Sequence, residues 1–177
     1  ITYGLYEVTE LAEGAKGNPG EKLILADARA ADVFAAGKVT AHARLRDVPA
    51  DLLRSMTLAH PFHGLAENGE WDFTVPLIDG DHVTDDAGTG FVHTAPSHGD
   101  DDYQMGLKHG LPMTYNVEPD GSYRKDLPVF GGQVIIQPDG KEGPANVEVI
   151  KALAAKGALF AKGKLKHSYP HSWRSKA

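Results

Sequence analysis

Glycine and proline interrupt this chain so often that a long helix cannot form. The 20 glycines and 11 prolines divide 177 residues into short segments bounded by turn signals such as Pro19-Gly20 and Asp79-Gly80. Short segments between turns favour strands with a few helices over a helical bundle. Because 41% of the residues are hydrophobic, a chain of this length can bury one core. We therefore expect a single α+β, β-rich domain over residues 1–177.

Hydrophobic alternation and helix-capping signals place the expected elements along the chain. Strands are expected at residues 1–8, 22–25, 39–45, 73–78, 90–94, 133–136 and 165–169, helices at 28–37, 97–109 and 146–156, and a loop at 116–131. In the helix at 97–109, Ser97 is expected as the N-cap, with Asp100 in a capping-box-like position and Gly110 after the last turn. His60 and His63, which flank a Pro-Phe pair, are interpreted as packing or turn residues.

The charge of the chain is negative and unevenly distributed. A formal net charge of -6 has the wrong sign for a domain that binds nucleic acid by its own electrostatics. Residues 67–102 hold many acids but no Lys or Arg, whereas residues 161–177 hold bases and no acid. We interpret the basic segment 161–177 as one that returns toward the core of a larger protein.

The residue types that are missing also restrict the function. The chain has no cysteine, which excludes disulfides, thiolate zinc sites and cysteine nucleophiles and is compatible with a reducing cytoplasm. No apolar run approaches the roughly 20 residues that span a bilayer, so we expect a cytoplasmic protein without a membrane partner. The chain opens at Ile1 on a strand-like pattern without an initiator Met, which favours a fragment of a longer protein.

One stretch concentrates the residues that carry chemistry. Residues 80–103 combine glycines, three histidines and three adjacent carboxylates around the expected strand-to-helix turn. His93 near the strand end and Asp102 in the first turns of the helix can reach one pocket, because strand ends and helix N-termini often converge on a ligand. The helix dipole favours the charge of Asp102, which can hold a substrate ammonium. Gly88 and Gly90 are expected to leave room for the backbone or sugar of a ligand.

Two other interpretations remain open on the residues alone. Acids in a first helical turn are often only dipole partners or caps, and a histidine at a strand end is often only a hydrogen-bonded structural group. Alternatively, His93, His98 and Asp102 can supply three metal ligands, although the run lacks the His-Glu-x-x-His signature. The glycines form neither a dinucleotide fingerprint nor a phosphate loop, which argues against nucleotide binding.

The same stretch resembles a known family. The runs Gly80-Asp81-His82-Val83-Thr84, Asp86-Ala87-Gly88-Thr89-Gly90 and Val92-His93-Thr94-Ala95-Pro96, followed by His98-Gly99 and Asp101-Asp102-Tyr103, closely resemble the editing (CP1) domain of isoleucyl-tRNA synthetases, which are class I aminoacyl-tRNA synthetases. The resemblance extends over about residues 56–176. Valyl enzymes typically carry Lys and leucyl enzymes Met where this chain has His93, so it points to the isoleucine branch. Ser97 departs from the Gly of many members.

The resemblance implies a fold, a reaction and partners. The implied fold is a β-barrel-like core with surrounding helices, inserted into a Rossmann-type synthetase domain. The implied reaction is hydrolysis of valine wrongly attached to tRNA(Ile), with valyl-adenylate as a further candidate substrate. The implied partners are the acceptor end of tRNA(Ile) and the remainder of the synthetase chain. The domain itself would need no cofactor, since ATP and Mg²⁺ act in the synthesis site of the parent enzyme. A metal-dependent hydrolase and a non-catalytic tRNA-positioning insertion are the alternatives.

The resemblance also assigns roles to residues. It makes Asp102 the acid that binds the amino group of the wrong amino acid, and His93 the pocket wall that limits side-chain size and helps to place the ester and water. It also implies substrate-binding residues, namely Gly90, Phe91, Val92, Thr94, Ala95, Asp101 and Tyr103. The Thr-rich segment that forms the opposite wall in the family lies upstream of Ile1, so we expect part of the pocket to lie outside this chain.

Overall fold

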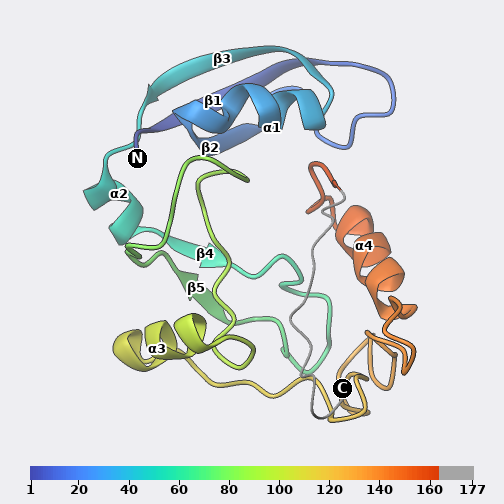
Figure 1. The fold of residues 1–177 in the computed structure, drawn as a ribbon. Helices are drawn as coiled ribbons and strands as arrows, with labels where there is room; N and C mark the ends of the chain where they lie inside the picture. Colours follow the sequence, from blue (N-terminus) through green and yellow to red (C-terminus); the bar gives the residue numbers. More distant parts are fainter. Residues whose placement is uncertain (164–177) are drawn as a thin grey trace.

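The computed structural model of this chain describes residues 1–163 and contains two open antiparallel sheets. The elements are β1 (Tyr3–Leu11), β2 (Lys22–Ala26), the 3-10 helix η1 (Asp27–Arg29), α1 (Ala30–Ala36), β3 (Val39–Asp47), α2 (Ala50–Ser55), β4 (Thr57–Ala59), β5 (Thr74–Pro76), α3 (Asp100–His109) and α4 (Ala145–Ala155). One sheet has the order β2-β1-β3, and β4 pairs with β5 in the other (Figure 1). The expected β-rich α+β class is confirmed, and the strands of the described residues form these separate sheets without closing into a barrel.

The N-terminal sheet follows from strict alternation in its central strand. In β1, Gly4, Tyr6 and Val8 are buried while the residues between them are more exposed, as expected when one sheet face is covered. Helix α1 supplies the cover, because Phe34 joins Tyr6 and Val8 in one buried cluster. The strands expected at 1–8, 22–25 and 39–45 and the helix expected at 28–37 are confirmed.

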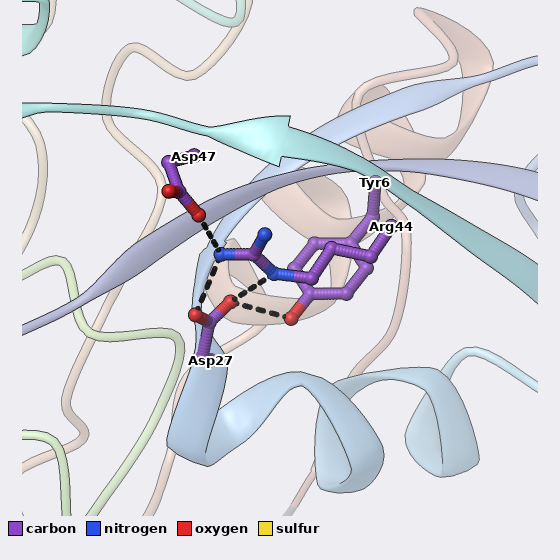
Figure 2. A network of polar contacts seen from close by, with 4 residues as sticks. All are labelled: Tyr6, Asp27, Arg44 and Asp47. Carbon is purple, nitrogen blue, oxygen red and sulfur yellow. Dashed lines mark hydrogen bonds and ion pairs between the residues drawn. The ribbon is translucent and has the colours of Figure 1, made fainter.

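A polar network fixes the place where β2 ends and the chain turns into η1 (Figure 2). The Asp27 carboxylate accepts hydrogen bonds from the Tyr6 hydroxyl at 2.6 Å and from Arg44 Nε and Nη2 at 3.0 and 2.8 Å. Arg44 also pairs with Asp47 at 2.7 Å. The bonds from Arg44, and next the bond from Tyr6, lower the pKa of Asp27 below its ordinary value. The network thereby connects all three strands of the sheet at one end.

A second core lies away from the N-terminal sheet. It consists of four buried residues from the loops after β4 and before α4, namely Phe62, Trp71, Leu127 and Phe130. Helix α4 packs on this cluster through Val149, Ala152 and Leu153, which confirms the helix expected at 146–156. The strand expected at 73–78 is confirmed as β5, whose partner β4 and the preceding helix α2 were not anticipated.

Phe160 brings the chain back from α4 to the N-terminal sheet. Its ring packs against the first buried cluster, and it lies so close to Gly37 that a Cβ there would be 2.3 Å from Phe160 Cε1. The ring is also close to Gly17, where a Cβ would be 2.8 Å away. The ring of Phe160 thus occupies space that side chains at Gly17 and Gly37 would fill.

One expected strand is wrong and another lies outside the described residues. Residues 133–136 form only isolated bridges, because Val134 pairs with Ser122 while Ile136 pairs with Glu142, so successive residues never share one partner strand. The closing strand expected at 165–169 lies beyond residue 163, the last that the structure describes. Within the described range no helix is both long and apolar enough to cross a membrane.

The network around Asp27 generates a stability prediction. A Cβ at Gly4 would lie 2.6 Å from Asp27 Oδ1, 2.8 Å from Tyr6 Cε2 and 2.9 Å from Arg44 Nε. We expect Gly4→Ala to force these groups apart and to lower the free energy of unfolding by about 1–3 kcal/mol, as other overpacked sites do. Urea unfolding measures the change, and Thr9→Ala, at an exposed position of the same strand, is the control. Equal stabilities for the two variants would contradict the prediction.

Candidate functional site

The segment that carries His93 is extended but is not a strand. We expected a strand at residues 90–94, and this expectation is wrong, because residues 91–95 join no sheet. Its backbone is held at its two ends by separate contacts instead of along a ladder of hydrogen bonds. In Figure 1 the chain between β5 and α3 rises to the end of β2 and returns to α3. The segment therefore bridges the N-terminal sheet and helix α3.

The upstream end of this segment is docked on the end of the β1–β2 pair. The Ala26 N–H donates to the Thr89 carbonyl at 3.0 Å, and the Tyr3 hydroxyl donates to the Gly90 carbonyl at 2.6 Å. The ring of Tyr3 also packs on Phe91, with ring centroids 4.8 Å apart. Two polar bonds and one aromatic contact thus hold three successive residues before Val92.

This docking requires a glycine at position 90. It is buried and has φ of +84°, a conformation that side-chain-bearing residues rarely adopt. A Cβ at this position would lie 2.4 Å from Ala26 Cβ. The protein itself thus fills the space that a side chain would take at Gly90, and a role of Gly90 in substrate binding stays a prediction. Gly88 has φ of +63°, and a Cβ there would meet nothing within 4 Å, so its turn conformation alone accounts for a glycine.

The downstream end is held by Asp102. The Asp102 Oδ2 accepts a hydrogen bond from the Ala95 N–H at 2.9 Å, across the turn at residues 96–98. Pro96 packs on the buried Gly106 of α3, where a Cβ would be 2.8 Å from Pro96 Cβ. Asp102 thus contacts the backbone of this segment two residues from His93, and the shared pocket of the His93 and Asp102 side chains stays a prediction.

Ser97 is not the N-cap of the helix. The helix begins at Asp100 with Gly99 in extended conformation as its N-cap, and no side chain caps it. The backbone turns once more before the helix, because the His98 N–H bonds to the Ala95 carbonyl at 2.9 Å. The expected C-terminal glycine is confirmed, since Gly110 adopts a left-handed conformation after His109.

The other predicted site residues differ in exposure. His93 is exposed and Val92 is 52% exposed, so both side chains are accessible to a ligand. Asp101 and Tyr103 are also exposed, whereas Phe91, Thr94 and Ala95 are partly buried. An open depression of about 370 Å³ lies beside the start of α3, but Tyr103 is the only predicted site residue that lines it. The exposed predicted side chains therefore lie on residues 92–93 and at the start of α3.

His60 is a neighbour of His93 that sequence reasoning did not find. It packs as expected, stacked on Trp71 with ring centroids 5.3 Å apart, and its Nδ1 accepts the Phe62 N–H at 3.1 Å. Burial, and then the nearby charge of His93, lower the pKa of His60 below 6.5. The two histidines are 33 positions apart in the sequence (93 minus 60). Only the tertiary fold brings them together, and no local pattern reports it.

The three-ligand metal set does not assemble. Among residues 1–163 no group of three His, Asp or Glu side chains lies close enough together to hold a metal ion. His98 lies in the turn before α3 instead of within the helix, so it does not share a helix face with Asp102. His98 and Asp102 are four residues apart, but the two side chains would point to the same side only in a continuous helix.

The lowered pKa of His60 generates a pH prediction. Because the folded state resists protonation below 6.5, the unfolded state binds more protons there, and stability falls as the pH decreases through this value. The loss is complete once the pH lies below the folded pKa. Urea unfolding between about pH 7 and pH 5 should show a smaller decrease for His60→Gln than for the wild type. Parallel pH profiles would contradict this account.

Comparison with known proteins finds that the chain is similar to isoleucine–tRNA ligases. No protein-family model matches it. It is 48% identical to the isoleucine–tRNA ligase of Rhodopseudomonas palustris over 99% of this chain and 18% of that protein. It is also 48% identical to the isoleucine–tRNA ligase of Caulobacter vibrioides, over all of this chain and 19% of the relative, and 49% identical to that of Mesorhizobium japonicum, over 99% and 19%. The chain thus spans less than a fifth of the length of these relatives. The resemblance read from its motifs is confirmed, and the chain corresponds over nearly its whole length to one segment of the isoleucine–tRNA ligases.

Proposed function

We propose that this chain is the editing domain of an isoleucyl-tRNA synthetase and hydrolyses the ester of valine wrongly attached to tRNA(Ile). One observation carries the proposal: the Ala95 N–H bonds to Asp102, which brings a half-buried carboxylate to the exposed segment that presents His93. An anionic oxygen and an imidazole at one surface suit a small substrate with an ammonium group and an ester. The match to isoleucine–tRNA ligases supports an aminoacyl ester on tRNA(Ile) as that substrate.

Asp102 is the proposed anchor of the amino group. Its Oδ2 is engaged by the Ala95 N–H, and within residues 1–163 no hydrogen bond to its Oδ1 is found. A carboxylate accepts several hydrogen bonds through its two oxygens, so one oxygen can keep the turn in place while the other binds an α-ammonium. The position of Asp102 in the first turn of α3 adds the favourable end of the helix dipole to the stability of its charge.

His93 is the proposed wall and water-placing group. Its exposed imidazole follows Val92, whose side chain is also accessible, so a bulkier amino acid would meet both groups. In the proposed step a water oxygen attacks the ester carbonyl carbon while its proton passes to a base or to the ribose. The bond from that carbon to the ribose oxygen then breaks, which releases valine and a free terminal ribose hydroxyl. No covalent enzyme intermediate is required.

A physical limit on selection explains why a second site is useful. Isoleucine and valine, the standard example of this problem, differ by one methylene, which is worth only about 1–3 kcal/mol of discrimination in a hydrophobic pocket. A separate site that admits valine and rejects isoleucine removes the remaining errors by hydrolysis. An exposed site on a small domain fits this task, because it must receive the end of a large nucleic acid.

The test of this function uses Asp102 and the full-length enzyme that carries this chain. Asp102→Asn keeps an oxygen that can accept the Ala95 N–H, but it loses the negative charge. We expect deacylation of preformed Val-tRNA(Ile) to fall by about 10- to 100-fold, the effect of losing one charge-assisted bond. Asp102→Ala removes both interactions and should be at least as slow. Aminoacylation with isoleucine should not change in either variant.

The Asp102 pair separates catalysis from folding. If Asp102→Asn edits at the wild-type rate while Asp102→Ala is slow, the carboxylate serves only to hold the turn, and its role as anchor is refuted. Loss of isoleucine charging in both variants would instead indicate a general folding defect. Urea unfolding of the same variants distinguishes that case directly.

The charge distribution generates a prediction about tRNA. Residues 67–102, a stretch that includes the proposed site segment, contain ten acids and no Lys or Arg. We therefore propose that the rest of the synthetase supplies most of the contacts to the acceptor end of tRNA(Ile). A salt titration should show weak binding of tRNA to this chain alone and tighter binding to the full-length enzyme, since phosphate contacts determine the salt dependence. Equal affinities would contradict this division.

A further inference from the structure

The backbone at His93 depends on contacts outside its own segment. Residues 91–95 belong to no sheet, so no ladder of hydrogen bonds determines where the His93 side chain starts. The downstream end is fixed at Ala95 by Asp102. The upstream end is fixed three residues before His93, at the Gly90 carbonyl, by the Tyr3 hydroxyl.

Tyr3 and Ala26 act together as one clamp. They are directly opposite each other in the antiparallel pairing of β1 with β2. From this one cross-strand pair, a side-chain hydroxyl reaches the Gly90 carbonyl and a backbone N–H reaches the neighbouring Thr89 carbonyl. Both donors come from the most regular part of the molecule. The clamp therefore ties residues 89 and 90, which belong to no sheet, to a regular strand pair.

The clamp and the segment fit each other closely. The ring of Tyr3 is tilted by 35° against Phe91, and a Cβ at Gly90 would be 3.3 Å from Tyr3 Cε1. Next to the clamp, Arg44 donates two hydrogen bonds to Asp27, which fix the residue that follows Ala26 even without the Tyr6 hydroxyl. Burial, and then the charge of Asp85, raise the pKa of Tyr3, so its hydroxyl stays protonated and remains a donor at neutral pH.

We propose that Tyr3 is a positioning residue for the editing reaction, because its hydroxyl bond to the Gly90 carbonyl sets the place of His93 relative to Asp102. This inference rests on the proposed function. It assigns a chemical role to the N-terminal sheet, which otherwise only supports the fold. Tyr3 touches neither substrate nor water in this scheme and acts through the backbone of residues 90–93.

The test compares two hydroxyl deletions on the same strand in the full-length enzyme. Tyr3→Phe keeps the ring against Phe91 and removes only the bond to Gly90. We expect kcat for Val-tRNA(Ile) deacylation to fall by about 10-fold, with KM and isoleucine charging unchanged, because Asp102 still anchors the substrate. Tyr6→Phe removes an equally short hydroxyl bond, to Asp27, and should lower the urea midpoint without lowering kcat.

A rescue variant makes the test decisive. Incorporation of 4-aminophenylalanine at position 3 restores an N–H donor at the end of the ring and should restore kcat. The proposal is overturned if Tyr3→Phe edits at the wild-type rate, if the amino analogue is as slow as Tyr3→Phe, or if Tyr3→Phe and Tyr6→Phe are slowed equally. A wild-type enzyme that does not deacylate Val-tRNA(Ile) would refute the proposed function itself. Editing lost in Asp102→Asn but intact in Tyr3→Phe would refute only the role of Tyr3.

Discussion

The close approach of one backbone turn to the end of the β1–β2 pair connects the fold of this protein to its candidate site. At Gly90 the turn lies so near Ala26 that a single added carbon would be 2.4 Å from the Ala26 Cβ. Ala26 has a fixed position because β1 and β2 pair regularly through five residue pairs, from Tyr3 opposite Ala26 to Glu7 opposite Lys22. Asp27 and Arg44 hold the next residue in place. Ala26, the regular β1–β2 pair and the buried Gly90 together allow the turn at residues 89–90 to pack on the sheet.

The candidate site combines a fixed backbone with accessible side chains. The segment through His93 is tied at Gly90 and at Ala95, while the side chains of Val92 and His93 between these points are exposed. Fixing the main chain reduces the ordering that a ligand would otherwise have to impose. Leaving the side chains open gives a large ligand access. Asp102 contributes to both properties, because one of its oxygens holds the turn and its charge remains beside the open surface.

The sequence was most informative where local patterns decide the structure. Alternation predicts β1, and the Gly110 signal marks the end of α3, because both depend on neighbours a few residues away. It was misleading at residues 90–94, where an apolar run resembles a strand but long-range contacts to Tyr3 and Ala26 replace a ladder. Gly90 was expected to leave room for a ligand, and the sequence could not show that the protein's own sheet lies on the side where its Cβ would be. His60 was placed among packing residues, and its position near His93 follows only from the tertiary fold.

The packing of Phe160 on the N-terminal cluster has a consequence for the order in which the chain can fold during synthesis. The ring fills a seat on the N-terminal sheet that is made by Gly17 and Gly37, far earlier in the sequence. A ribosome releases the N-terminal part of a chain first, and this part can begin to fold while the remainder is still being made. The sheet and α1 can therefore assemble early, with an uncovered apolar seat that stays exposed until residue 160 emerges. Until then the apolar side chains of the first cluster lack the cover that the Phe160 ring provides.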